Sequence, residues 1–198
     1  MTTASVSRAY AASFVVAGIA LNVIAGRLAA LTGLPGIYLD LSGTLLTALI
    51  LGPWWAATTG LLSNLVTGLI AGPVSIPFGI VNMAFGLVVG FLADKGWTKT
   101  WIKTIVTFVI ACFVVSGTAS LIVVFLFGGA TGAPQDIIVF ALLSTTGWDL
   151  LASVFVADII GKPIDMFFEF AIAFAILRAL PGEYGLKTPL KRPVAKVR

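Results

Sequence analysis

The apolar stretch Asp158–Pro181, with the sequence DIIGKPIDMFFEFAIAFAILRALP, decides how the rest of the chain is interpreted. It is long enough to cross a bilayer as a helix, yet it carries Lys162, Asp165 and Glu169. On a helix these three residues have the spacing i, i+3 and i+7, so they share one face. Ionisable side chains are costly in hydrocarbon, and this face must therefore contact protein or water. The stretch is predicted to be the last transmembrane helix of a protein that binds a small solute.

Composition places the whole chain in the membrane class. Of its 198 residues, 59% are hydrophobic and 10% are charged, and the mean hydropathy is +1.10. Soluble domains carry about 25% charged residues, which cover their surface. The sequence therefore predicts an all-α integral membrane protein.

The residue types exclude several kinds of chemistry. The chain has no histidine and one cysteine, which rules out zinc sites, Cys/His nucleophile pairs and Ser-His-Asp triads. An all-carboxylate metal site stays open at this point. The chain has no GxxxxGK[ST] loop, so active transport would need a partner that binds the nucleotide. Its basic residues are interpreted as topology signals that contact anionic lipid, not as a nucleic-acid surface. We expect no enzymatic activity, no cofactor and no metal.

Glycine- and proline-rich breaks divide the apolar sequence into spans. The second span is short, and its tyrosine is expected to anchor it at the membrane interface. The six spans are expected at Ala9–Ala30, Tyr38–Gly52, from the turn at 52–55 to Ala71, Phe78–Ala93, Trp101–Phe127 and Asp158–Pro181.

A further stretch, Ile137–Ile160, is apolar enough to span but is interrupted at Ser144–Asp149. The positive-inside rule favours six spans over seven, because most cations then lie in the cytoplasm and only Arg27 and Lys162 lie outside. We therefore predict a multi-pass plasma-membrane protein with both termini cytoplasmic. Residues 1–181 would form one membrane domain and residues 182–198 a basic tail. The stretch Ile137–Ile160 would be an outer helical lid or a re-entrant hairpin.

This topology gathers polar and aromatic side chains in the outer half of the membrane. A mostly apolar hollow with a few convergent polar groups is typical of a small-molecule pocket. Phe167 is a further expected wall, whereas Asp136 and Asp158 are interpreted as solvated loop acids. The predicted substrate-binding residues are Tyr38, Asp40, Asn64, Asn82, Trp148, Asp149, Lys162, Asp165, Phe168 and Glu169.

Two alternatives stay open for these residues. Lys162 could pair with Asp165 for structure alone, and Asn64 and Asn82 could bond across helices. If the pocket exists, its acids outnumber its bases and it has aromatic faces. This favours a flat, neutral or cationic ligand over an anionic one.

Several segments together resemble one protein family. They are YLDLSGTLLTALILGPWW at 38–55, GLLSNLVTG at 60–68, IVNMAFG at 80–86, DKGW at 94–97 and FGGATG at 127–132, followed by a terminal helix with early acids that ends in Leu-Pro. In this order they resemble the substrate-binding S component of an energy-coupling factor (ECF) vitamin transporter. The resemblance covers Ala9 to Pro181.

The resemblance implies six helices and an outward-facing vitamin pocket built from the later helices and the loop between the first two. It also implies a membrane-embedded T component and two cytoplasmic ATPases as partners. In the family an Ala-x3-Ala pattern on the first helix contacts the T component, and the nearest match here is Ala9, Ser13 and Ala17, where the serine departs from the pattern. Rival interpretations are a stand-alone carrier or channel, a structural scaffold, and a membrane enzyme that uses Asp165 and Glu169.

Overall fold

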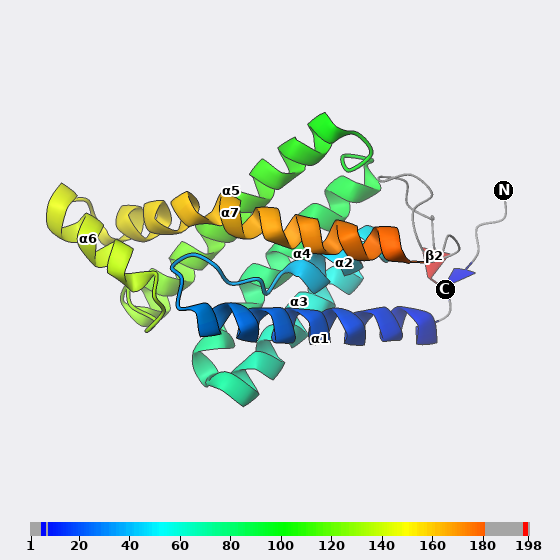
Figure 1. The fold of residues 1–198 in the computed structure, drawn as a ribbon, viewed down its shortest axis with the longest axis horizontal. Helices are drawn as coiled ribbons and strands as arrows, with labels where there is room; N and C mark the ends of the chain where they lie inside the picture. Colours follow the sequence, from blue (N-terminus) through cyan, green and yellow to red (C-terminus); the bar gives the residue numbers. More distant parts are fainter. Residues whose placement is uncertain (1–4, 7, 181–195, 198) are drawn as a thin grey trace.

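A computed structural model describes residues 5–6, 8–180 and 196–197, and this part of the chain is almost entirely helical (Figure 1). Two short strands, β1 (Ser5–Val6) and β2 (Lys196–Val197), pair in parallel and bring the two ends of the described chain together. The basic tail predicted at 182–198 lies outside the described residues apart from β2. The helices are α1 (Arg8–Thr32), α2 (Ser42–Ile50), α3 (Pro53–Ala71), the 3-10 helix η1 (Pro73–Ser75), α4 (Gly79–Asp94), α5 (Trp101–Phe127), α6 (Asp136–Thr146) and α7 (Leu150–Ala179).

Helix α2 is the centre around which the other helices pack. All of its residues are buried, and it contacts α1, α3, α4 and α7. Leu45 and Leu49 of α2 belong to the main hydrophobic core, with Phe85 from α4 and Met166 from α7. A helix without an exposed polar face is typical of a protein core or a membrane span, and here other helices cover every residue of α2. The predicted span Tyr38–Gly52 is therefore a short central helix preceded by a loop.

Small residues let the backbones around α2 come close together. Gly18 of α1 faces Gly43 of α2 so closely that a Cβ atom on Gly43 would lie 1.9 Å from the carbonyl oxygen of Gly18. A Cβ atom on Gly60 of α3 would lie 2.6 Å from the carbonyl oxygen of Asn82 in α4. Close backbone approach of this kind is how helices gain van der Waals contact inside a membrane.

A buried polar network joins the first four helices. Asn22 of α1 donates hydrogen bonds to Thr44 Oγ1 (2.9 Å) and Ser63 Oγ (3.0 Å). Thr44 in turn donates to Asn82 Oδ1 (2.6 Å), and Asn82 Nδ2 donates to the backbone oxygen of Asp40 (3.0 Å). Since a buried polar group is costly when unpaired, this network fixes the relative positions of the helices.

Within the described ranges, three helical segments are long and apolar enough to cross a membrane. They are α1, the segment Pro73–Asp94 that combines η1 with α4, and α5. Helix α5 has the predicted bounds, Trp101–Phe127. Helix α7 carries several charged residues, and α2 has only 9 residues, so length and composition do not establish six spans.

A helix, α6, lies between α5 and the last helix, as the prediction of an outer helical segment requires, but the predicted bounds Ile137–Ile160 are wrong. Gly147 adopts the left-handed conformation (φ 68°) and ends α6, as glycine commonly does at a helix C-terminus. Asp149 then caps the next helix, because its side chain accepts the backbone N–H of Ala152 at 2.8 Å. From Leu150 onward the chain is one helix of 30 residues that continues through Pro163 to Ala179. The last helix thus begins at Leu150 and not at Asp158.

The close contact between α1 and α2 yields a first prediction. Replacing Gly43 with alanine should lower the melting temperature of the purified protein in detergent, because the backbone of Gly18 cannot move aside without displacing α1. The matched control is Gly117→Ala on α5, where an added Cβ atom would have no heavy atom within 4 Å. Alanine there should stabilise the helix by up to about 1 kcal/mol. Equal melting temperatures for the two variants would contradict this packing.

Candidate functional site

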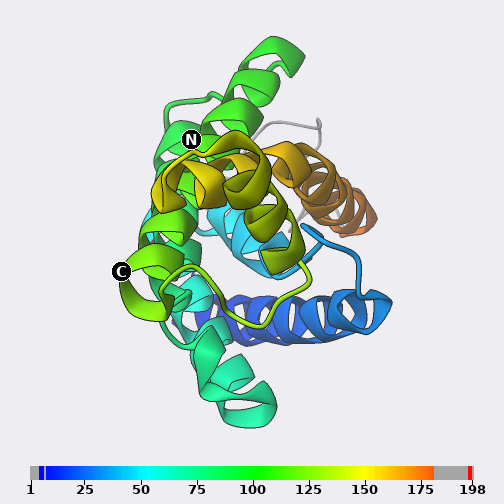
Figure 2. The same cartoon turned by 90° about the vertical axis from the view of Figure 1, so that its left-hand side faces the viewer.

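A cavity of about 230 Å³ lies at the end of the bundle where α6 is attached. Figure 2 looks onto this end and shows α6 and the preceding loop crossing over the helices. The walls come from the loop before α2, from α3, η1, α4, α5, α6 and α7, and from the loop between α5 and α6. The polar lining residues are Tyr38, Asp40, Asn64, Thr67, Ser75, Asn82, Ser120, Thr131, Gln135, Asp136, Asp158 and Lys162.

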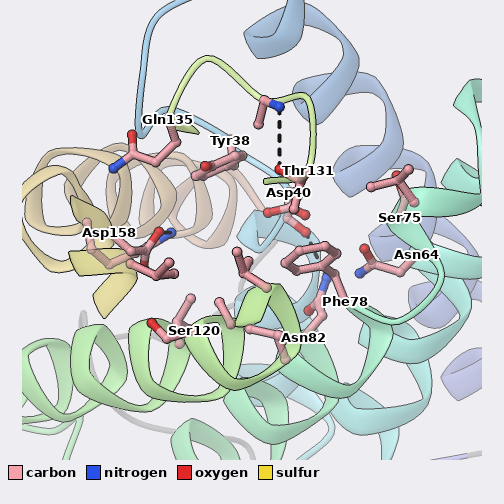
Figure 3. Close-up of a pocket in the computed structure, with 18 of the residues that line it drawn as sticks. Tyr38, Asp40, Asn64, Ser75, Phe78, Asn82, Ser120, Thr131, Gln135 and Asp158 are labelled. Atoms are coloured by element: carbon pink, nitrogen blue, oxygen red, sulfur yellow. Dashed lines mark hydrogen bonds and ion pairs between the residues drawn. The ribbon is translucent and has the colours of Figure 1, made fainter. Parts of the chain in front are cut away.

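The two sides of the cavity differ in chemistry (Figure 3). Tyr38, Gln135 and Asp158 lie on one side, near Lys162. Asn64 and Ser75 lie on the other side. Apolar side chains from α4, α5, α6 and α7 line the cavity between these two sides. The cavity therefore combines a charged side with a neutral, hydrogen-bonding side.

Lys162 is held entirely by groups of the protein. Its ammonium nitrogen lies 3.7 Å from Asp158 Oδ1 and 3.3 Å from Asp165 Oδ2, and the residue is 3% exposed. The same nitrogen lies 4.7 Å from the centre of the Tyr38 ring, a cation–π distance. A buried lysine needs this compensation, because an unpaired charge at such a site is very costly.

Two carboxylates of α7 bind the loop that leads into α2. Asp165 Oδ1 accepts the backbone N–H groups of Tyr38 (2.9 Å) and Leu39 (3.0 Å). Glu169 accepts the N–H of Leu41 (2.8 Å) and the hydroxyl hydrogen of Ser42, the first residue of α2. A negative charge at the start of a helix is also favoured by the helix dipole. Both carboxylates are fully buried, as the predicted helix face requires.

Two further acids lie at the cavity, one in a loop and the other at the start of α6. Asp40, in the loop between α1 and α2, is partly buried. Removal of its carboxyl from water, and then the nearby charge of Asp165, raise the pKa of Asp40 to about 6, although Lys162 opposes the shift. Asp136 accepts the backbone N–H groups of Thr131 (2.9 Å) and Gly132 (2.7 Å) and so folds the loop between α5 and α6 over the cavity.

The structure brings half of the predicted binding residues to the cavity. The residues that line it are Tyr38, Asp40, Asn64, Asn82 and Lys162.

The other half lie outside the lining. Asp165 and Glu169 bind the loop behind it, and Asp149 caps α7. Trp148 and Phe168 are each 47% exposed and face away from the bundle core. A ligand contact by any of these residues stays a prediction.

Sequence reasoning missed other lining residues. Asp158 was expected to be solvated but is buried, because it pairs with Lys162 one turn along α7. The i, i+4 spacing of these two residues on a helix could have predicted this ion pair. Asp136, also expected to be a solvated acid, is bound to backbone N–H groups. Phe78 and Gln135 had no motif that marked them, since their place depends on how the loops fold back.

Comparisons with known proteins give no relative: no family model, no curated protein and no solved structure matches this chain. Among the residues that the structure describes, no group of three or more Asp, Glu, Cys or His side chains is arranged to hold a metal ion.

The loop contacts of α7 yield a second prediction. Glu169→Gln keeps one acceptor oxygen and should lose only part of the stability, whereas Glu169→Leu leaves both loop donors unpaired. Each buried unpaired donor costs about 1–3 kcal/mol, so melting temperatures should fall in the order wild type, Gln variant, Leu variant. The control is Lys103→Gln, an exposed charged residue in the first turn of α5. A Leu variant as stable as wild type would contradict the proposed role of Glu169 in holding the loop.

Proposed function

We propose that this protein is the substrate-binding subunit of a membrane transporter. It would take a water-soluble vitamin or a related small molecule from outside the cell and deliver it inward with an ATP-driven partner. The observation that carries the proposal is the cavity, which segments distant in sequence build together. It joins an apolar lining to a few convergent polar groups, which is what a small-molecule site requires.

The exposed face of α1 supports a role for membrane partners. Ala9, Ser13 and Ala17 are all exposed and lie at intervals of four residues on this helix. The Ser13 hydroxyl donates a hydrogen bond to the carbonyl oxygen of Ala9 (3.0 Å), so it is satisfied within the helix. Serine therefore leaves this face small and free of an unpaired donor, which suits close approach by another helix. A T component and two cytoplasmic ATPases are the partners that we propose.

The arrangement of the ends supports the proposed topology of six spans with both termini in the cytoplasm. The start of α1 and the end of α7 lie at the same end of the molecule, opposite the cavity (Figure 1). If both helices cross the bilayer, the number of spans is even. The cavity would then open toward the outside.

A stand-alone carrier or channel would use the same cavity, so the two proposals differ only in the need for a partner. A structural scaffold would not need a cavity with polar groups on opposite sides. For an enzyme, the adjacent acids Asp165 and Glu169 would have to be accessible, but both are occupied by backbone N–H groups of the loop.

The face on α1 yields a prediction that separates binding from transport. The bound compound would first be identified by native mass spectrometry of the purified protein. Ala17→Trp should then abolish cellular uptake of this compound and leave its dissociation constant unchanged, because the exposed face is remote from the cavity. Ala30→Trp, an exposed position near the other end of α1, is the control and should keep uptake. Uptake that persists without any ATPase partner would instead favour a stand-alone carrier.

The topology yields a separate prediction. Reporter fusions at both ends of the chain should be active only in the cytoplasm, because both ends are proposed to lie there. A cysteine placed at Thr146, the exposed last residue of α6, should react with an impermeant maleimide in intact cells. Labelling of a C-terminal tag from outside would show an odd number of spans and overturn the topology.

A further inference from the structure

Two buried acceptor atoms of residues that line the cavity lack a hydrogen-bond partner among the described residues. They are Gln135 Oε1 and Asp158 Oδ2, which belong to two different elements of the fold. Both residues line the cavity, and they are only 6% and 8% exposed. Buried polar atoms are nearly always paired, so two unpaired acceptors at one cavity need an explanation.

The hydrogen bonds and ion pairs of the other side-chain atoms show that both unpaired atoms are acceptors. The Gln135 amide nitrogen donates to the carbonyl oxygen of Ala157. Because a carbonyl can only accept, the amide cannot be turned around, and Oε1 must be the remaining atom. Asp158 uses Oδ1 toward Lys162, which leaves Oδ2. Both unpaired atoms therefore accept hydrogen bonds and neither can donate one.

The surrounding charge points to the same kind of ligand group. The charged residues in the lining are three acids, Asp40, Asp136 and Asp158, and one base, Lys162. The ammonium group of Lys162 is already engaged by Asp158 and Asp165 and by the Tyr38 ring. Within the described lining, an anionic ligand group would thus meet excess negative charge and no uncommitted cation.

The opposite wall suits a flat ring. Phe78 lines the cavity across from Asp158 and lies beside Asn82 and Asn64 in Figure 3. Its ring stacks on Phe127 of α5, with the centroids 6.0 Å apart and the planes 11° apart, so it presents a supported face. Asn64 and Asn82 place amide groups near the same wall.

We propose that the side of the cavity formed by Gln135 and Asp158 receives the amino or amidinium group of a small, flat ligand. The two unpaired oxygens accept its N–H hydrogens, and the carboxylate of Asp158 balances its charge. The ring of the ligand extends toward Phe78. This inference rests on the proposed function, because it names the chemical class that the same cavity binds.

The test uses three probes of nearly equal shape: benzamidine, which is cationic, benzamide, which is neutral, and benzoate, which is anionic. Each is titrated into the purified full-length protein by calorimetry. We expect benzamidine to bind at least tenfold more tightly than benzoate, with benzamide between them. Asp158→Asn should weaken benzamidine binding at least tenfold, and the exposed-acid control Asp94→Asn should leave it unchanged.

Asp158→Asn also removes a charged partner of Lys162, so a loss of binding in this variant alone would not separate a ligand contact from misfolding. A second variant therefore tests the same side of the cavity. Gln135→Met leaves the pairing of Lys162 intact and keeps the volume of the side chain. It removes the acceptor Oε1 together with the Nε2 donor to Ala157, and it too should weaken benzamidine binding. Benzoate binding that equals or exceeds benzamidine binding would overturn the inference about the amino or amidinium group. It would still support the proposal that the cavity binds small molecules. Benzamidine binding that neither variant weakens would overturn the placement of the group. Failure of all three probes to bind at millimolar concentration would count against the inference and the proposed function together.

Discussion

The hydrogen bonds between the α7 carboxylates and the loop before α2 are the constraint on which the rest of the structure depends. Asp165 and Glu169 together bind three backbone N–H groups and one hydroxyl within residues 38–42. Leu39 takes a positive φ of 52°, a conformation that a side chain disfavours and that these contacts hold in place. The loop in turn supplies Tyr38 and Asp40 to the cavity. The same contacts therefore position both the central helix and one wall of the site.

If the apolar helices cross a membrane, as we propose, lipid weakens the usual hydrophobic driving force, and hydrogen bonds and close packing stabilise the fold instead. Apolar side chains gain little by leaving lipid for the protein interior, so helices in a membrane associate through backbone contact and polar bonds. The pair Gly18 and Gly43 provides the backbone contact, and the network from Asn22 to Asn82 provides the polar bonds. Both act on α2, which explains how a helix of 9 residues can stand at the centre of the molecule.

Sequence reasoning found the features that one helix or one turn determines by itself. The bounds of α5 and the buried face with Lys162, Asp165 and Glu169 follow from local apolar length and helical spacing. Sequence reasoning failed where tertiary packing determines which groups a side chain contacts. The spacing of Asp165 and Glu169 indicates that they face inward, but not that both bind a loop more than a hundred residues earlier. The division of Ile137–Ile160 was missed for a different reason. It depends on the αL glycine at 147 and the cap at Asp149, two local signals that a hydropathy pattern does not record.

The assignment of partners along α7 explains why one face can serve both structure and binding. Going from the C-terminal side toward the cavity, Glu169 is held by the loop, Asp165 is shared between the loop and Lys162, and Lys162 is shared between Asp165 and Asp158. Each buried ionisable group on this face thus has its partners, until the series reaches Asp158. There the protein supplies a partner for one carboxylate oxygen but leaves the other unpaired at the cavity. The acidic character of the site thus follows from where this series of pairings ends, and a ligand that donates hydrogen bonds would complete it.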